Sequence, residues 1–404
     1  MRKPEVRGRS CALGRVVLIA LVCLAWLGIA SIAHAAPRIG VMTMQPGAIF
    51  FERFGHNALI VDDPARGEPI SYNFGFFDLA EPGFVGRFAH GDMQYALVEL
   101  PLAQDLTYYR EVGRGVRIQW LNLTPGQAWQ LADGLAWNAR PENARYRYDY
   151  FTDNCSTRVR DALDGALGGR LRQQLEHRSQ GSTYRSEAVR LASPAPWMWL
   201  GFDVGLGPWS DRPLTRWQEG FVPMRLADAL RGMRGADGRP LVRSEVDVLP
   251  HRIAPEPRER ERRLWPWLLT GLAIAGALAA LAMRAPRMVA GVALGFWLVC
   301  GIAGVLLLYL WGFTEHRGAW ANQNLLLLNP LCWLLLAGAW RGARGAVRPS
   351  PLFTAVLLCV LAGAGLALAL HAFPVPAQRN GQWIALLLPV HVALAWAFLR
   401  RQRA

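Results

Sequence analysis

The pattern of apolar and polar residues divides the chain into a short leader, a polar domain and a strongly apolar C-terminal third. In the leader, basic residues precede an apolar run from Val16 to Ile32, and the small-x-small sequence Ala33-His34-Ala35 follows. This order is typical of a signal peptide and its cleavage site. We therefore expect a signal peptide at residues 1–35. An uncleaved first membrane span is the alternative, and either one exports the residues that follow.

Short runs of strand-forming residues, separated by glycine, proline and aspartate, fill much of residues 36–231. Six strands are expected, at Ile39–Met44, Ala58–Asp62, Ile70–Phe77, Gln94–Leu100, Val116–Leu123 and Tyr146–Phe151. Thr124-Pro125-Gly126-Gln127 has the residues of a capping box with proline at the first helical position, so a helix is expected to start there. A second helix is expected near Cys155. These elements predict an α+β domain, an antiparallel sheet with helices packed on one side.

The C-terminal part, residues 264–404, is dominated by apolar stretches of the length needed to cross a membrane. Five spans are expected, at residues 265–283, 288–311, 324–340, 352–372 and 383–399. Residues 232–263 are rich in glycine, proline and charge and show no sustained period, which predicts a linker. The expected architecture is therefore an α+β exported domain followed by an α-helical transmembrane bundle.

The position of the charge indicates topology rather than a nucleic-acid partner. The formal net charge is +14, of which the leader carries +4, the polar domain +1 and the apolar part +9. Eight arginines of the apolar part fall in the loops on the side opposite the domain, against two, Arg317 and Arg379, on the domain side. Cytoplasmic loops are enriched in basic residues. We therefore expect a multi-pass protein of the bacterial inner membrane with its N-terminal domain in the periplasm.

Cys155 is the only cysteine between the leader and the apolar part. An unpaired cysteine in an exported domain is either inert and buried or a reactive thiol. Asp153 or Asn154 can cap a helix that begins with Cys155 in its first turn, where unsatisfied backbone N–H groups, and Arg158 one turn on, would favour the thiolate. The local sequence thus favours a nucleophile over a buried core cysteine.

A thiol nucleophile needs a base within hydrogen-bond reach, most often a histidine. His56 follows a glycine at the start of an expected strand, which is a suitable fixed position for a base. His90 is the next candidate, and His177 and His251 lie in polar, loop-like surroundings. We therefore expect His56 to be the partner of Cys155.

Tryptophans gather in the stretch from Pro194 to Pro223, among glycine and proline residues. They are Trp197, Trp199, Trp209 and Trp217. Such residues suit a membrane interface or a groove for an acyl chain, and packing on the sheet explains them equally well.

Three motifs in this order resemble a known family: Phe54-Gly55-His56 at a strand start, Tyr72-Asn73-Phe74-Gly75 on the next strand, and the hexapeptide 153–158 around Cys155. They are similar to the periplasmic domain of the Bacteroides-type lipoprotein N-acyltransferases, the Lnb family. More distantly they resemble permuted papain-like enzymes such as lecithin retinol acyltransferase. The likeness continues near Thr314-Glu315-His316 and in residues 322–331, which resemble an outer loop of that family.

The resemblance implies a permuted papain-like fold and a thiol mechanism without a cofactor. His56 would take the proton of Cys155, and the thiolate would attack a phospholipid ester to give a thioester. An amine would then accept the acyl chain, and the resemblance implies that this amine is the N-terminus of a lipoprotein. Papain-like enzymes imply Asn73 as the residue that orients the imidazole, with Ser71, Tyr72 and Asp78 left open.

Further polar residues are candidates for binding the substrate. They are Arg158, Tyr72, His316, Asn322 and Asn324. Those of the outer loop, with Asn329, would either bind a lipid headgroup or brace the bundle against the domain. Scattered histidines and one cysteine lack the spacing of a metal site. A papain-like hydrolase acting on a cell-wall peptide or an ester remains the alternative function, and a membrane scaffold without activity is the third.

Overall fold

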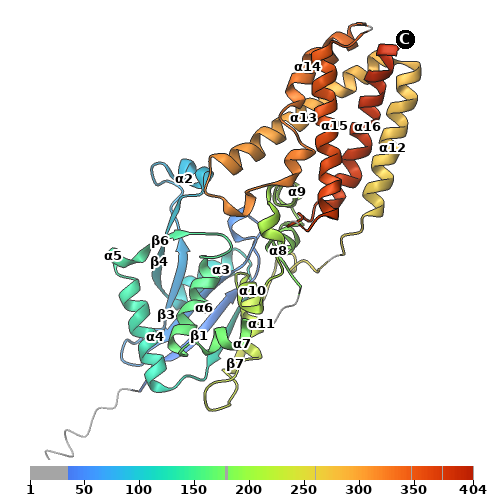
Figure 1. Cartoon of the computed structure of the whole chain (residues 1–404). Helices are drawn as coiled ribbons and strands as arrows, with labels where there is room; N and C mark the ends of the chain where they lie inside the picture. The colour runs from blue at the N-terminus through green and yellow to red at the C-terminus, as the bar shows by residue number, and fades with distance from the viewer. Residues whose placement is uncertain (1–34, 178–180, 260, 347, 375, 404) are drawn as a thin grey trace, which may run out of the picture.

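The computed structural model describes residues 35–177, 181–259, 261–346, 348–374 and 376–403. The expected signal peptide lies, apart from its last residue, outside the described residues. Figure 1 shows two parts: a sheet domain built from the N-terminal half, and a bundle of long helices built from the C-terminal third. This is the α+β domain and helical bundle that the sequence predicts.

The sheet domain is built on an antiparallel sheet with the strand order β6-β4-β3-β2-β1-β5-β7. The strands are β1 (Arg38–Met44), β2 (His56–Asp62), β3 (Ile70–Phe76), β4 (Met93–Pro101), β5 (Val116–Leu121), β6 (Arg145–Tyr148) and β7 (Val242–Leu249). All six expected strands are present, with small differences at their ends. Strands β1 to β4 each pair with the next strand in the sequence. Strand β5 does not continue this order and pairs with the free edge of β1.

The segment 232–263, expected to be a linker, contains strand β7 of the sheet. This strand pairs with β5 at the edge of the sheet and most of its side chains are exposed. Arg117 on β5 pairs with Asp247 and Glu245 on β7, so charged side chains hold the two strands together. An edge strand with charged side chains lacks the clear apolar alternation of a core strand, which explains why the sequence pattern misses it.

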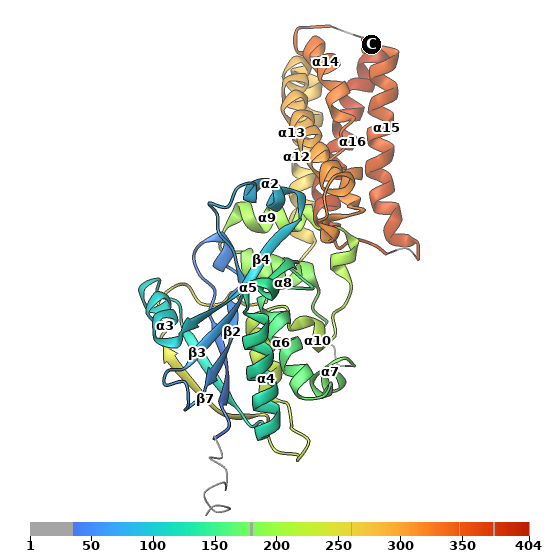
Figure 2. The same cartoon turned by 90° about the vertical axis from the view of Figure 1, so that its left-hand side faces the viewer.

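Helices cover both faces of the sheet, not one as expected (Figure 2). The first face is covered by α4 (Pro125–Asn138) and α6 (Cys155–Ala166), with a core that includes Leu59, Val159 and Leu163. The opposite face is covered by α3 (Leu102–Glu111), with a separate core that includes Ile60 and Tyr109. The capping box predicted at the start of α4 is present, because the side chains of Thr124 and Gln127 each bond to the other's backbone N–H.

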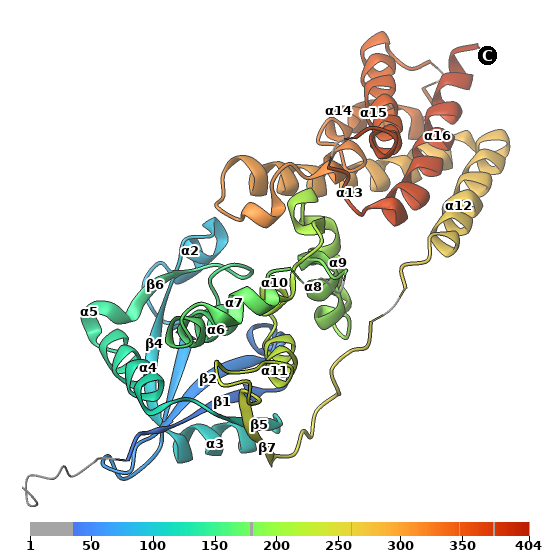
Figure 3. The same ribbon diagram turned by 60° about the horizontal axis from the view of Figure 1, so that its bottom comes forward.

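Shorter helices complete the domain. They are α2 (Phe84–His90), α5 (Pro141–Ala144), α7 (Arg170–Leu175), α8 (Tyr184–Ala192), α9 (Pro196–Gly205), α10 (Arg216–Glu219) and α11 (Pro223–Arg231). Of these, α8 and α9 lie between the sheet and the bundle (Figures 1 and 3). The residues that follow α9 contact the loop after α13, because the Gly207 N–H and the Ser210 hydroxyl both donate to the Gly318 carbonyl.

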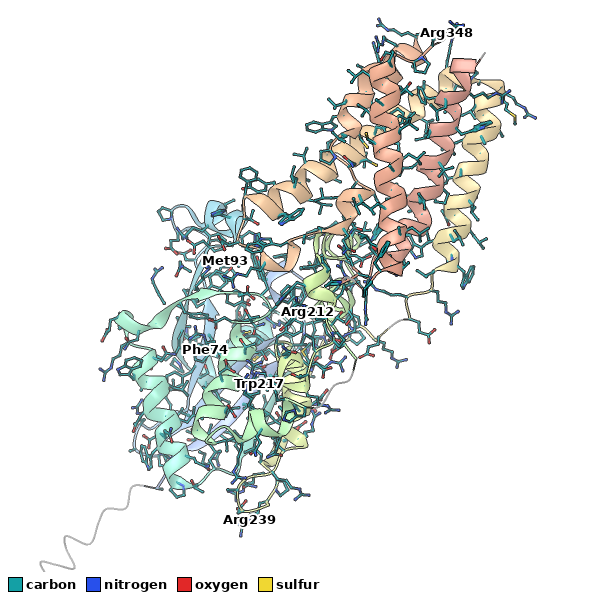
Figure 4. The ribbon with its side chains drawn as sticks, in the orientation of Figure 1. Phe74, Met93, Arg212, Trp217, Arg239 and Arg348 are labelled. Atoms are coloured by element: carbon teal, nitrogen blue, oxygen red, sulfur yellow. The ribbon has the colours of Figure 1, made fainter. Side chains whose placement is uncertain are left out.

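The bundle consists of α12 (Trp265–Arg284), α13 (Pro286–Gly312), α14 (Cys332–Ala343), α15 (Pro351–Ala369) and α16 (Gly381–Arg403). Within the described residues, four helices are long and apolar enough to cross a membrane: α12, α13, α16, and α15 with its short continuation to Ala372. Arg348 lies at the end of the bundle remote from the sheet domain (Figure 4), as the distribution of arginines predicts.

The third expected span, residues 324–340, is not a continuous helix. Its first part is the 3-10 turn η4 (Gln323–Leu326), and α14 itself has only 12 residues. At 1.5 Å per residue such a helix is about 18 Å long, too short for a hydrocarbon core of about 30 Å. Pro330 marks the break, and the buried polar side chain of Asn324 lies before it. Irregular backbone of this kind is tolerated at membrane depth only where protein surrounds it.

Polar contacts hold the domain against the bundle. Arg185 of α8 is fully buried and forms an ion pair with Asp211, whose carboxylate also accepts a hydrogen bond from the backbone N–H of Arg379 beside α16. The amide groups of Asn322 and Asn324 both donate to the Val204 carbonyl at the end of α9. The junction is therefore made of specific bonds between residues far apart in the sequence.

Candidate active site

Cys155 is the first residue of α6, as the sequence predicts. Asn154 is the N-cap: its side chain accepts a hydrogen bond from the Thr157 backbone N–H, and the Thr157 hydroxyl accepts one from the Asn154 N–H. The Asn154 amide also donates to the carbonyls of Tyr150 and Phe221. The helix start that carries the thiol is therefore fixed from both sides.

His56 is the first residue of β2, placed there by Gly55. Gly55 has φ of +78°, and a Cβ at this position would lie 2.9 Å from the Met44 carbonyl oxygen. Only glycine adopts this conformation at such close approach without strain. The turn brings the imidazole of His56 close enough to the Cys155 thiol for each group to shift the pKa of the other. The pair expected from the sequence thus meets in the structure.

Asn73 completes a relay behind the imidazole. The His56 Nε2 and the Asn73 Oδ1 lie 3.0 Å apart, and Asn73 Nδ2 lies 2.9 Å from the Asp105 Oδ2 on α3. A carboxylate accepts hydrogen bonds, so the Asn73 NH₂ group must face Asp105 and the Asn73 oxygen must face His56. Nε2 of His56 therefore carries a proton, which leaves Nδ1 for the thiol. Ser71 donates its hydroxyl to the same Asp105 oxygen at 2.8 Å.

Of the residues left open for the third position, Asn73 is the one that contacts His56. Tyr72 is buried in the core on the α6 face of the sheet, and Asp78 accepts a hydrogen bond from the Ala80 backbone in a turn. Asp105 is a residue of the relay that the sequence analysis missed. Its burial arises from the packing of α3 on the sheet, and no short motif indicates it.

The surroundings of the thiol favour an ion pair with His56. Burial alone would raise the pKa of Cys155, but the charge of His56, its hydrogen bond and two backbone N–H groups lower that pKa on balance. Burial likewise lowers the pKa of His56, and the charge and hydrogen bond of Cys155 more than offset it, so the pKa of His56 is raised. The lowered pKa of Cys155 and the raised pKa of His56 both mean that the thiolate–imidazolium form is favoured.

The two backbone donors at the thiol are the N–H groups of Asn57 and Ser156. Their side chains are locked together, because the Ser156 hydroxyl lies 2.8 Å from the Asn57 Oδ1 and 2.6 Å from the Gly220 carbonyl oxygen. This contact ties the start of β2 to the start of α6. Pre-positioned N–H groups beside a nucleophile are the kind of donor that stabilises an oxyanion.

A glycine and a buried tyrosine lie close to Cys155. Gly75 has φ of +94° at a bulge of β3, and a Cβ placed on it would lie 3.7 Å from the Cys155 Cβ and 3.8 Å from the Tyr146 hydroxyl. That hydroxyl is buried and has no hydrogen-bond partner among the described residues. Burial, followed by the nearby Cys155, raises the pKa of Tyr146 well above its ordinary value, so the hydroxyl keeps its proton.

A cavity of about 970 Å³ opens onto the thiol and the imidazole. Many aromatic side chains of the sheet domain line it, among them Phe77, Phe88 and Tyr148. Leu310 of α13 and residues 315–319 of the loop after it contribute the rest of the wall. Phe74 and Met93 also line it, and Met93 lies nearer the bundle (Figure 4). The cavity thus extends from the reactive pair to the membrane part of the chain.

The expected binding residues divide between this cavity and the framework. His316 lines the cavity and stacks on Tyr150. Arg158 instead pairs with Asp153 and lies over the Tyr146 ring, and neither it nor Tyr72 lines the cavity. Asn322 and Asn324 brace the bundle against α9, which is the second of the two roles expected for them.

The remaining candidates also have defined positions. Trp197 lines the cavity, whereas Trp209 stacks on Tyr184 and Trp217 packs in the domain core. His251 accepts a hydrogen bond from the Gly115 backbone and is not part of the cavity wall. Within the described part of the chain, no group of three or more His, Cys, Asp or Glu residues could hold a metal ion.

Comparison with known families agrees with this architecture. Residues 26–190 match the family model described as Lnb N-terminal periplasmic domain, and residues 264–403 match the Lnb transmembrane domain. The comparisons with curated proteins and with solved structures gave no match. The chain is therefore an integral membrane protein with an α+β periplasmic domain. It belongs to the Lnb family.

Proposed function

We propose that this protein is a thiol acyltransferase of the bacterial inner membrane, which moves an acyl chain from a phospholipid to an amine through a thioester on Cys155. We further propose that the acceptor is the N-terminal amine of a lipoprotein. The observation that carries the proposal is a single cavity that contains both the Cys155–His56 pair and the loop after the membrane-spanning helix α13.

The first half of the reaction uses the ion pair. The Cys155 thiolate attacks the ester carbonyl, and the oxyanion that forms accepts hydrogen bonds from the N–H groups of Asn57 and Ser156. The carbon–oxygen bond to the lipid then breaks. His56 gives its Nδ1 proton to the leaving alkoxide, which departs as a lysophospholipid and leaves an acyl-thioester on Cys155.

The second half reverses the proton transfer. The acceptor amine attacks the thioester carbonyl, neutral His56 takes a proton from the attacking nitrogen, and the Cys155 thiolate leaves. The products are an amide and the original ion pair. Asn73 and Asp105 hold the imidazole with Nδ1 toward sulfur through both steps, because the relay fixes the proton on Nε2.

The shape of the cavity supports a lipid as the donor. Ligand cavities for small molecules span about 300–1,000 Å³, and a cavity of about 970 Å³ with aromatic walls suits a long acyl chain. His316 and Arg317 at the membrane side can contact a phosphate headgroup. A hydrolase for a soluble cell-wall peptide would have no use for walls of this kind.

The test uses the purified full-length chain in vesicles that contain a phospholipid with an alkyne-tagged acyl chain. The proposal requires a label on the protein that hydroxylamine removes, that Cys155→Ser abolishes, and that the matched control Cys359→Ser retains. Cys359 is an exposed cysteine of the bundle. A label that persists in Cys155→Ser would overturn the thioester scheme.

A second step identifies the acceptor. A diacylated lipopeptide with a free N-terminus is added to the labelled enzyme, and its N-acetylated form serves as the control. Mass spectrometry should find the tagged chain in amide linkage on the free lipopeptide alone. Release of free tagged fatty acid in both reactions would instead assign a hydrolase.

A further inference from the structure

Large apolar side chains surround the mouth of the cavity without being covered by protein. We call this set the rim; it consists of Ile49, Phe51, Phe76, Leu79, Val85 and Trp197. Leu79 is 60% exposed, Val85 74% and Trp197 66%. All rim residues except Val85 also line the cavity, and Val85 lies on α2, whose Phe88 lines it. Contiguous apolar patches of this kind on a folded domain mark a site of protein or membrane contact.

The chain fixes the rim close to the membrane surface. The backbone N–H of Glu315 bonds to the His90 carbonyl at the end of α2 at 2.7 Å, and Gly91 packs against the backbone of His316. Residue 315 follows the end of α13 by only three positions. Figures 1 and 3 both show α13 leaving the bundle and ending beside α2. The position of α2 along the membrane normal is therefore set by the end of a membrane-spanning helix.

α13 has 27 residues and is about 40 Å long, compared with about 30 Å for the hydrocarbon core. Figure 1 shows that α13 is inclined to α12, α15 and α16, so its length exceeds the thickness that it crosses. It starts just after Arg284, at the surface opposite the domain, and Figures 1 and 2 show its other end, with α2, beside the domain-side half of the bundle. Phe313, just after α13, is 67% exposed and continues the lipid-facing surface of the bundle toward the rim.

The charges near the rim are compatible with this position. Glu81, between Leu79 and Val85, is paired with both Arg87 and Arg145. Asp78 accepts a backbone hydrogen bond within its turn. Amphipathic surfaces that lie at the interface bury their apolar residues about 5–10 Å below the headgroups.

We infer that the rim inserts into the outer leaflet of the bilayer and forms a lateral portal, through which an acyl chain of a membrane lipid enters the cavity without crossing water. The insertion itself rests only on the exposed apolar surface and its height. The passage of the acyl chain rests on the proposed function. A protein partner is the competing occupant, and the experiment below separates the two.

The experiment places an environment-sensitive NBD fluorophore on single cysteines of the full chain in phosphatidylethanolamine–phosphatidylglycerol vesicles. The background carries Cys155→Ser, so that no acyl transfer takes place, together with Cys11→Ser, Cys23→Ser and Cys359→Ser; Cys300 and Cys332 are buried in the bundle. Labels go on Leu79→Cys and Val85→Cys in the rim, with Trp137→Cys on α4 and Val246→Cys on β7 as matched controls. The two control residues are also exposed and apolar, and lie on elements far from the bundle.

Vesicles with doxyl-labelled acyl chains should quench both rim labels several-fold more than both controls, and the rim labels should emit at shorter wavelength. Quenching of both rim labels at the level of the controls would overturn the inference, and is the outcome expected if the rim binds a protein. Because the background is inactive, this result is independent of the proposed function. Conversely, a failure to form the acyl-enzyme would leave the insertion result unchanged.

Discussion

The relay behind His56 gives the sharpest prediction, through the substitution Asp105→Asn. In the structure, Asn73 Nδ2 and the Ser71 hydroxyl converge on one oxygen of Asp105. An amide of the same shape is neutral, and can present either an oxygen or an NH₂ group to Asn73. The substitution therefore weakens the constraint that keeps the Asn73 oxygen toward His56, with no large change in volume.

The expected magnitude follows from the bonds involved. A hydrogen bond to a charged group contributes about 1.5–3 kcal/mol and a neutral one about 0.5–1.5 kcal/mol. Two such bonds change here, so a loss of about 1 to 3 kcal/mol in the stabilisation of the reacting state is expected, or roughly 5- to 160-fold in rate. The charge of Asp105 also raises the pKa of His56, so its removal should lower that pKa and make the ion pair less favourable.

Two measurements check this prediction: the rate at which the tagged acyl chain labels Cys155, and the pH dependence of alkylation by iodoacetamide. Asp62→Asn is the matched control, since Asp62 lies at the far end of the same strand as His56 and pairs with Arg38 at the surface. Thermal unfolding of each variant reports whether the fold is intact. If Asp105→Asn is folded and keeps both the labelling rate and the alkylation profile of the control, the relay argument is wrong.

Three further predictions concern the thiol, its access and the junction. Because the pKa of Cys155 is lowered, iodoacetamide should react with it below pH 8.5, the usual thiol value. In His56→Ala only the two backbone N–H groups oppose the effect of burial, so the midpoint of the alkylation rate should move upward, and an equal midpoint in both proteins would contradict the ion pair. Gly75→Ala and the control Gly67→Ala both place alanine at positive φ, so each variant should lose about 1–3 kcal/mol of folding stability. Only Gly75→Ala adds a methyl group beside Cys155, so only this variant should also slow the alkylation of Cys155. Asp211→Ala leaves its buried arginine partner unpaired, so denaturation in detergent should show a loss of about 3–5 kcal/mol, and a loss below about 1 kcal/mol would contradict the assigned role.

The sequence predicts well those features that depend on neighbours along the chain. The alternation of apolar residues locates six strands, the Thr124 capping box locates the start of α4, and the Asn154 cap places Cys155 in the first turn of α6. The geometry of His56 follows from the glycine before it. The motif order and the family resemblance are enough to expect that the thiol and the imidazole come together.

Features that depend on distant contacts escape such analysis. Strand β7 is held by charged pairs with β5, more than a hundred residues away in sequence. Asp105 has the sequence surroundings of an ordinary helical surface residue, and only the packing of α3 on the sheet buries it. Hydropathy likewise assigns residues 324–340 to one span, although Asn324 is satisfied by a carbonyl of α9 and the helix begins only at Cys332.

The junction has a consequence for biogenesis. The carbonyl of Leu206, at the end of α9, accepts hydrogen bonds from Asn322 before α14 and from Gln378 just before α16. The exported domain is synthesised first, yet these donors reach it only after the last helix has been threaded into the bilayer. A fragment cut off before Trp265 would expose that edge to water, so enzymology on a secreted fragment would describe a protein whose final assembly step had never taken place.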